Sequence, residues 1–200
     1  MDNIDALVQA VAERLFIPLE ASGRHVHVTE QQAQQLFGHG LTEKRPLSQP
    51  GQYLANERLT VIGPKGRFEN VAVLGPARKE AQVEVSLTDA KTLGVTPPVK
   101  LSGDVSGSPG VVLEGPNGSV QLDRGVIAAQ RHIHMTPQAA ANFGVEDKQV
   151  VRLQTFTQRP LIFDDVVVRV SDKFATFAHL DYDEANACGF VNGDLGRILP

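Results

Sequence analysis

The sequence predicts a mainly β protein: two small β-barrels capped by short α-helices, arising from an internal repeat and preceded by an N-terminal amphipathic helix. Three observations support this class. Glycine (18) and proline (12) are plentiful among the 200 residues, which favours short strands joined by tight turns. Strand-like segments outnumber helix-like ones. One strand–helix module also recurs along the chain, which indicates duplication.

The first sixteen residues are expected to form an amphipathic helix that ends before Pro18. Its apolar stripe is made of Ile4, Leu7, Val8, Val11 and Leu15. Two interpretations stay open. The helix packs on its own domain, or it is a short targeting helix whose stripe docks in a groove of a partner.

Two β-hairpins follow. Segments 59–62 and 68–74 flank the turn 63–66, and segments 111–113 and 119–122 flank the turn 115–118. Further strands are expected at 150–156 and 166–170, and short helices at 30–37, 87–93, 137–143 and 183–188.

The repeated module is the strongest sign of organisation. Residues 24–29 (RHVHVT) and 131–136 (RHIHMT) each precede a short segment that ends in Phe-Gly, and the histidine pairs are offset by 107 positions. A third, degenerate copy begins at Val83 and runs through Leu93-Gly94-Val95. Each copy has the pattern of a strand, a Thr or Ser at a helix N-cap, a short helix and a terminal glycine.

The two His-x-His pairs indicate metal binding. Side chains alternate along a strand, so His25 and His27 share one face, as do His132 and His134. Zinc takes three or four such ligands. One pair alone is more often structural, but two pairs in equivalent places favour a two-metal site, or one site formed between pseudo-symmetric halves. These pairs contain four of the six histidines.

Each pair needs a further ligand to complete a catalytic zinc site. Glu84 is the first candidate, because a carboxylate between Val83 and Val85 needs a partner if it is buried; the alternative is an exposed strand carboxylate. His179 is the second, with a satisfied core histidine as its alternative. His39 lies between two glycines in an expected loop and is left out.

Three arginines accompany these ligands. Arg24 and Arg131 point to the face opposite their neighbouring histidines, so they are expected to support the site rather than bind metal. Arg78 lies six residues before Glu84 and is a candidate phosphate clamp. A solvated loop arginine is the alternative for Arg78.

Bulk properties exclude some classes. A net charge of −4 argues against nucleic-acid binding through bulk electrostatics. The single cysteine, Cys188, excludes an internal disulfide and fits a reducing cytosol. Neither a signal peptide nor an apolar run of about 20 residues is evident, so we expect a soluble, cytoplasmic protein without membrane contact.

Several motifs in a fixed order resemble the PduL-type phosphotransacylases, the phosphate propanoyltransferases associated with bacterial microcompartments. The resemblance extends from Ile17 to the C-terminus. It is carried by Ile17-Pro18-Leu19, Ser22 to His27, Leu47 to Tyr53, Leu74 to Arg78, Gln82 to Ser86, Arg131 to Pro137 and His179 to Ala187.

The resemblance implies a pair of β-barrels whose first strand crosses into the second barrel. The helix is then 1–16, the first barrel 24–130, and the second barrel 17–23 with 131–200. It implies one zinc on His25, His27 and Glu84, and another on His132, His134 and His179. It also implies that Arg78 is catalytic and positions phosphate, and that coenzyme A, as substrate or product, contacts Ser22, Leu74 and Asn186.

Two departures concern this last contact: Gly23 replaces the usual Asn, and Ala72 stands where a basic residue is expected. The implied reaction interconverts propanoyl- or acetyl-coenzyme A and phosphate with acyl phosphate and coenzyme A. We expect direct transfer, a homodimer, and docking to a microcompartment through residues 1–16. A zinc-dependent thioester or phosphoester hydrolase and a zinc-stabilised adaptor are the alternatives.

Overall fold

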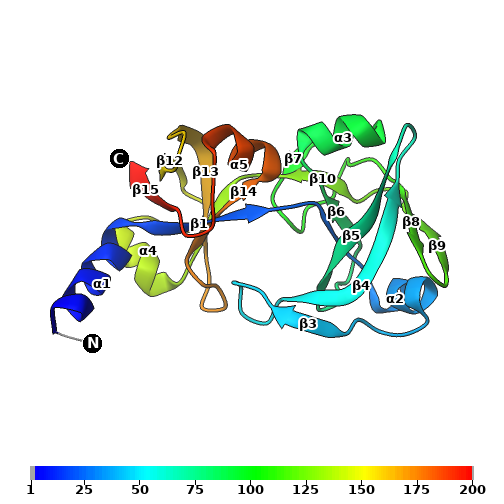
Figure 1. Ribbon diagram of the computed structural model, residues 1–200, viewed down its shortest axis with the longest axis horizontal. Helices are drawn as coiled ribbons and strands as arrows, with labels where there is room; N and C mark the ends of the chain where they lie inside the picture. Colours follow the sequence, from blue (N-terminus) through cyan, green and yellow to red (C-terminus); the bar gives the residue numbers. More distant parts are fainter. Residues whose placement is uncertain (1–2, 200) are drawn as a thin grey trace. The chain divides into compact units, whose positions relative to one another are not determined.

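A computed structural model describes residues 3–199, which fall into two compact units (Figure 1). Unit 1 is Met1–Ser22 with Arg131–Pro200, and unit 2 is Gly23–Gln130. The chain therefore passes from one unit to the other twice, each time just before a His-x-His strand. Each unit has a hydrophobic core of its own.

Unit 1 is a closed barrel of six strands in the order β1-β14-β11-β13-β12-β15. Its strands are β1 (Ile17–Ser22), β11 (His132–Met135), β12 (Val150–Phe156), β13 (Ile162–Val170), β14 (Phe177–Asp181) and β15 (Leu195–Leu199). Its helices are α1 (Asn3–Leu15), α4 (Pro137–Phe143) and α5 (Tyr182–Cys188). Antiparallel pairing of β1 with β15 closes the ring around buried Ile133, Leu153 and Leu180.

Unit 2 is a nine-stranded sheet in the order β7-β10-β6-β2-β5-β4-β8-β9, with β3 paired to β4 off this path. Its strands are β2 (His25–His27), β3 (Glu43–Pro46), β4 (Tyr53–Ile62), β5 (Arg67–Gly75), β6 (Gln82–Glu84), β7 (Val99–Lys100), β8 (Val112–Gly115), β9 (Gly118–Gln121) and β10 (Val126–Ala129). Its helices are α2 (Glu30–Phe37) and α3 (Leu87–Leu93).

The predicted mainly β class is confirmed, as are both hairpins, β4–β5 and β8–β9. Of the two predicted helix-capped barrels, the one in unit 1 is confirmed. The prediction of a second is wrong for the described residues, because the end strands of unit 2, β7 and β9, pair with β10 and β8 and do not close the sheet. Helices α2, α3 and α4 have the predicted bounds. Helix α5 begins one residue earlier than predicted, at Tyr182, because Asp181 is its N-cap and accepts the backbone N–H of Glu184.

Four copies of the module are present, one more than the sequence indicated. Each has an N-cap side chain that accepts the N–H three residues later, and each helix ends at a glycine in the left-handed region. The four N-caps are Thr29, Ser86, Thr136 and Asp181. The additional copy is β14 with α5, and it contains His179 and the predicted helix at 183–188.

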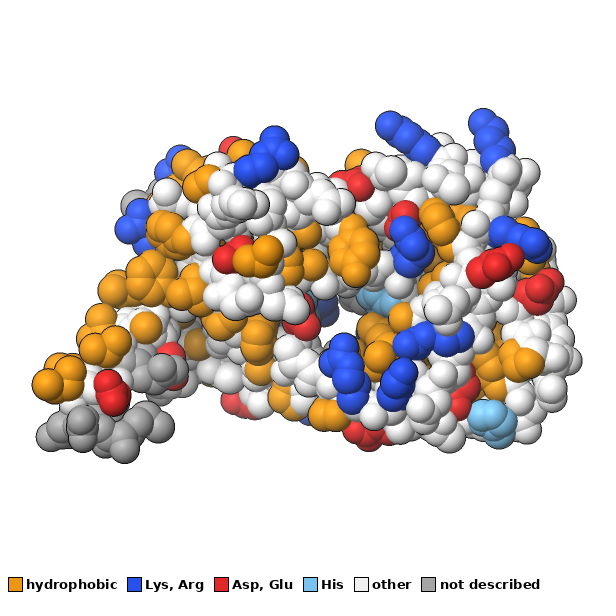
Figure 2. Space-filling model, viewed as in Figure 1, with side chains coloured by type: hydrophobic (Ala, Val, Ile, Leu, Met, Phe, Trp, Pro, Cys, Tyr) orange, Lys and Arg blue, Asp and Glu red, His pale blue; other side chains and the backbone are white. Residues whose placement is uncertain are grey.

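Helix α1 confirms the helical part of the N-terminal prediction, with residues 1–2 outside the described part of the chain. Its apolar stripe is exposed: Ile4 retains 72% and Leu7 65% of their accessible surface, and apolar side chains gather along α1 in Figure 2. This exposure favours the second interpretation, a helix that docks on a partner, although α1 also contacts α4 of its own unit. None of the helices within residues 3–199 is long and apolar enough to cross a membrane.

Candidate metal centres

The triad of unit 2 is formed by two adjacent strands. His25 and His27 project from one face of β2, and Glu84 projects from β6, whose antiparallel register places Glu84 opposite His25. One ligand atom from each of the three side chains lies within 4.8 Å of the others. All three residues are buried, so the predicted alternative of an exposed Glu84 does not apply.

Backbone carbonyls fix the tautomers of both imidazoles. The Nδ1 of His25 lies 2.8 Å from the carbonyl oxygen of Gly23, and the Nδ1 of His27 lies 3.2 Å from that of Leu74. A carbonyl only accepts, so each Nδ1 carries the hydrogen and each Nε2 keeps its lone pair. The Nε2 of His25 is 3.5 Å from Oε1 of Glu84. Both rings thus present the nitrogen that a metal would use.

Charge sets the protonation of this triad, and it favours cation binding at Glu84 and His27 but not at His25. Burial favours the neutral form of His25, but the Glu84 carboxylate outweighs it and raises the pKa of His25. Burial, with the charges of His25 and Arg78, holds the pKa of His27 well below its usual range. Although burial opposes it, the two histidines and a hydrogen bond from Ser102 hold the pKa of Glu84 far below its usual value. An ionised carboxylate and a neutral imidazole are the forms that bind cations.

The triad of unit 1 repeats this strand geometry with different ligands. His132 and His134 project from β11, and His179 comes from antiparallel β14, where it pairs with His132. Their ligand atoms also lie within 4.8 Å of one another. The Nδ1 of His134 is 3.2 Å from Nε2 of His179. Glu20, on neighbouring β1, places a carboxylate oxygen 3.5 Å from Nδ1 of His179.

One spacing unites the ligands of both triads. The last ligand of each copy precedes the helix N-cap by two residues, and this holds for His27, Glu84, His134 and His179. Glu84 and His179 are therefore equivalent positions. The spacing from ligand to N-cap to terminal glycine is a sequence signal that would have identified both third members.

The motif arginines hold helices in place. Arg24 binds Asp89 through Nε (3.0 Å) and Nη2 (2.7 Å), and Arg131 donates from Nη1 to Oε1 of Glu184 at 2.5 Å. Each carboxylate is the third residue of the helix that follows the triad's second strand. Each guanidinium therefore ties the His-x-His strand to that helix, the supporting role that the sequence predicted.

Arg78 lies beside the triad of unit 2. Its backbone N–H donates to the carbonyl oxygen of Val28, and its Nη1 donates to Oγ of Ser102 at 3.2 Å. Its charge contributes to lowering the pKa of His27. Arg78 is half-buried and bonded to Ser102, which favours the phosphate-clamp interpretation over a solvated loop arginine. Gln82 and Ser102, which bind Glu84, were missed by sequence reasoning.

The chain was compared with known proteins. The sequence profile of the phosphate propanoyltransferase family matches residues 18–191. The chain belongs to this family. It is 51% identical over 198 residues to the phosphate propanoyltransferase of Clostridioides difficile, covering 98% of this chain and 95% of the relative. The Enterococcus faecalis protein of the same name is 50% identical, covering 100% and 98%. The resemblance is thus confirmed, and with it the class of enzyme, a phosphate acyltransferase.

The expected coenzyme A residues of this family member are divided between the units. Leu74 in unit 2 gives its carbonyl to His27. Ser22 and Asn186 belong to unit 1, where Ser22 pairs with Asp181, two residues beyond His179. The substitution at Gly23 leaves the contact with His25 intact, because this contact uses the backbone carbonyl. Ala72 pairs with His25 and supplies no charge.

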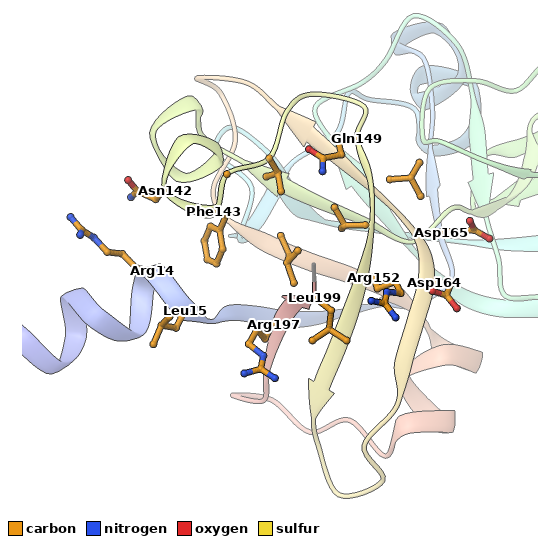
Figure 3. A pocket seen from close by; sticks show the side chains of 15 residues that line it. Arg14, Leu15, Asn142, Phe143, Gln149, Arg152, Asp164, Asp165, Arg197 and Leu199 are labelled. Atoms are coloured by element: carbon orange, nitrogen blue, oxygen red, sulfur yellow. The ribbon is translucent and has the colours of Figure 1, made fainter.

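Unit 1 also contains a cavity of about 650 Å³, which is separate from the triad of this unit. Arg14, Arg152 and Arg197 line it with Asp164 and Asp165, as Figure 3 shows. Strands β11 and β14, which carry the triad, contribute no lining residue. The candidate centres are therefore recognised by their donor atoms rather than by this cavity.

Both donor sets fit zinc. Two histidines with a glutamate, and three histidines, are ligand sets of catalytic zinc sites that leave a fourth position for water or substrate. The fixed tautomers of His25 and His27 and the ionised Glu84 satisfy the requirement that ligands be deprotonated.

Proposed function

We propose that this chain transfers a short acyl group, propanoyl or acetyl, between coenzyme A and phosphate with the help of two zinc ions, one held by each triad. The observation that carries the proposal is the repeated triad: two donor sets at equivalent positions in a phosphate acyltransferase. The set of unit 2 is buried and lies beside Arg78, and that of unit 1 is buried except for the half-buried His179. Membership of the family supports the acyl substrates and the reaction. The distances between the side chains support the two ligand sets.

Bound zinc supplies positive charge that holds phosphate oxygens and stabilises the negative charge that develops on the thioester carbonyl. Arg78 aligns the attacking phosphate oxygen through its planar fork of donors. The phosphate oxygen attacks the carbonyl carbon, the carbon–sulfur bond breaks, and coenzyme A leaves as a thiolate that takes up a proton. In the reverse direction the thiol of coenzyme A attacks acyl phosphate.

The proposal includes direct transfer without an acyl-enzyme. Cys188 is buried, and burial raises the pKa of its thiol, which disfavours the nucleophilic thiolate form. The hydroxyl of Ser102 receives hydrogen bonds from Arg78 and Gln82, so its lone pairs are already engaged. Rapid exchange of an acyl group onto the protein without phosphate and coenzyme A would contradict this step.

The test is phosphate-dependent release of coenzyme A from acetyl- and propanoyl-coenzyme A, with acyl phosphate measured as the product. We expect phosphate to be required, and Arg78→Ala to raise KM for phosphate and lower kcat. Arg67→Ala, which removes an exposed arginine paired with exposed Glu69, is the control. Release without phosphate, yielding free acid, would establish the hydrolase instead. Zinc binding without any turnover would establish the adaptor.

We also propose that the enzyme lies in the cytoplasm, inside a bacterial microcompartment, to which it docks through residues 1–16. The exposed stripe of α1 supports this, since apolar side chains on one face suit a groove on a partner. Fusion of residues 1–16 to a fluorescent protein should direct it to microcompartments, and Leu7→Asp should abolish this. Asp5→Asn, a change at an exposed position off the stripe, should not. Diffuse fluorescence of the unmodified fusion would contradict docking.

A homodimer is also proposed. Exposed apolar side chains on the barrel of unit 1 support it, among them Val150, Phe156 and Ile162. Light scattering of the purified protein should give twice the chain mass of 21.6 kDa. A mass of one chain at micromolar concentration would contradict the dimer.

A further inference from the structure

Ser102 makes three hydrogen bonds within unit 2. It lies in the loop that follows β7, and its Oγ is 2.8 Å from Oε1 of Glu84, 2.8 Å from Nε2 of Gln82 and 3.2 Å from Nη1 of Arg78. A loop residue 18 positions beyond Glu84 thus touches both the candidate ligand and the candidate phosphate clamp.

The chemistry of the partners fixes the direction of all three bonds. A serine hydroxyl has one hydrogen to donate and two lone pairs to accept with. The guanidinium of Arg78 and the amide nitrogen of Gln82 can only donate, so they use both lone pairs. The single hydroxyl hydrogen must therefore go to Glu84. Ser102 is saturated, and turning its hydroxyl would break at least one bond.

The loop that carries Ser102 is itself anchored. The backbone N–H of Gly103 donates to Oε1 of Gln82 at 2.7 Å, and Gln82 is buried on β6. The Nε2 of Gln82 also lies 2.5 Å from Oε1 of Glu84. Lys100 and Asp104 close the loop with an ion pair of 2.8 Å. The position of Ser102 is thus set by the same strand that carries Glu84.

From this network we infer that Ser102 is a positioning residue that couples the phosphate-aligning guanidinium to the metal-binding carboxylate. The inference rests on the proposed function. Removing the hydroxyl releases Glu84 from one donor and Arg78 from one acceptor at the same time. Zinc affinity in unit 2 should fall and phosphate should be aligned less well. Residues that hydrogen-bond to a metal ligand typically contribute about 10–100-fold to metal affinity or activity.

The test compares Ser102→Ala with Ser102→Thr, which keeps the hydroxyl. Zinc retention is measured against a competing chelator, and kcat and KM for phosphate are measured separately. Ser102→Ala should weaken one of the two zinc ions about tenfold and raise KM for phosphate severalfold. Ser102→Thr should restore both to within about threefold of wild type. Thr92→Ala removes an exposed hydroxyl of the same unit that donates to the carbonyl oxygen of Thr88, and should change neither.

A double variant tests the coupling. If Ser102 acts on phosphate through Arg78, Ser102→Ala should not raise KM for phosphate further once Arg78 is Ala. Three results would each overturn the inference. Ser102→Ala could match wild type in zinc retention and in KM for phosphate. Ser102→Thr could lose as much zinc affinity as Ser102→Ala, or Ser102→Ala could still raise KM for phosphate when Arg78 is Ala. Zinc retention is measured without substrate. Absence of phosphate-dependent turnover in wild type would therefore contradict the proposed function, while the chelator assay still tests the hold of Ser102 on Glu84.

Discussion

The two triads occupy equivalent positions but differ in charge and in support. In unit 2 the third member is the carboxylate Glu84, held by Gln82 and Ser102. In unit 1 it is the imidazole His179, which lies near Glu20 and contacts His134. The backbone frame is the same, since β2 lies between β5 and β6 as β11 lies between β13 and β14.

The difference indicates a division of labour between the proposed zinc ions. Three neutral imidazoles leave the full charge of the metal in place, whereas a glutamate neutralises part of it. A zinc ion held by His132, His134 and His179 would therefore keep more of its charge for polarising substrate. One held by His25, His27 and Glu84 would be positioned by the network that also holds Arg78. Duplication accounts for the shared backbone frame, and the third ligand is the position at which the two triads differ.

Removal of the third ligand should have the largest effect. Glu84→Ala and His179→Ala should each leave one zinc per chain and lower kcat by about a hundredfold or more, because a main source of charge stabilisation is lost. Metal analysis and steady-state kinetics check this. His39→Ala removes a largely exposed histidine outside both triads and should retain both ions and full activity. Two zinc ions in either ligand variant would show that the triads are assigned wrongly.

Exchange of the third ligand sharpens the comparison. Glu84→His gives unit 2 the ligand set of unit 1 and should keep both zinc ions, but it removes the acceptor of Gln82 and Ser102. We expect kcat/KM for phosphate to fall about tenfold, within the range found for loss of such supporting contacts. The reciprocal His179→Glu is the matched variant. Wild-type kinetics of Glu84→His would show that the carboxylate has no separate role.

The motif arginines should affect stability more than metal content. Arg24→Lys and Arg131→Lys each remove a planar fork that ties a strand to the next helix, and should cost about 1 kcal/mol of unfolding free energy. Denaturant unfolding of metal-free protein measures it. Arg67→Lys alters an exposed ion pair and should shift stability by less than about 0.5 kcal/mol. Loss of zinc with unchanged stability would place these arginines at the metal instead.

The smallest effect concerns a buried carboxylate of unit 2 outside the triad. Burial opposes ionisation of Glu57, but the hydroxyl and backbone N–H of Thr42 outweigh it and lower the pKa of Glu57 below its ordinary value of 4.5. A lowered pKa stabilises the fold above the unfolded value, and this stabilisation is lost as pH falls through the folded value.

The stability advantage of wild type over Glu57→Gln should therefore be present at neutral pH and shrink as pH falls below about 4.5. Unfolding free energies measured across this range test it. Glu69→Gln, at an exposed ion pair, is the control. An advantage that grows on acidification would contradict the assigned hydrogen bonds.

Local signals predicted much of the fold. The bounds of α2, α3 and α4 followed from an N-cap hydroxyl and a terminal glycine, which act within one helix. Strands such as β1, β10 and β14 were not delimited in advance, because they are short and their pairing partners lie far away in the sequence. Only tertiary pairing determines where such strands begin and end.

The sequence predicted the candidate metal ligands but not the residues that hydrogen-bond to them. The His-x-His pairs have a period of two that is visible in one strand. Gln82 shares that period with Glu84 and could have been recognised. Ser102 has no local pattern, since its role arises from a loop brought back to β6 by the hydrogen bond from Gly103 to Gln82.

Anomalous X-ray diffraction at the zinc edge, on crystals of the protein as purified, tests the central claim most directly. We expect two peaks per chain. One should lie about 2.0–2.2 Å from the ligand atoms of His25, His27 and Glu84, and the other at the same distance from those of His132, His134 and His179. A single peak, or zinc bound to other residues, would contradict it.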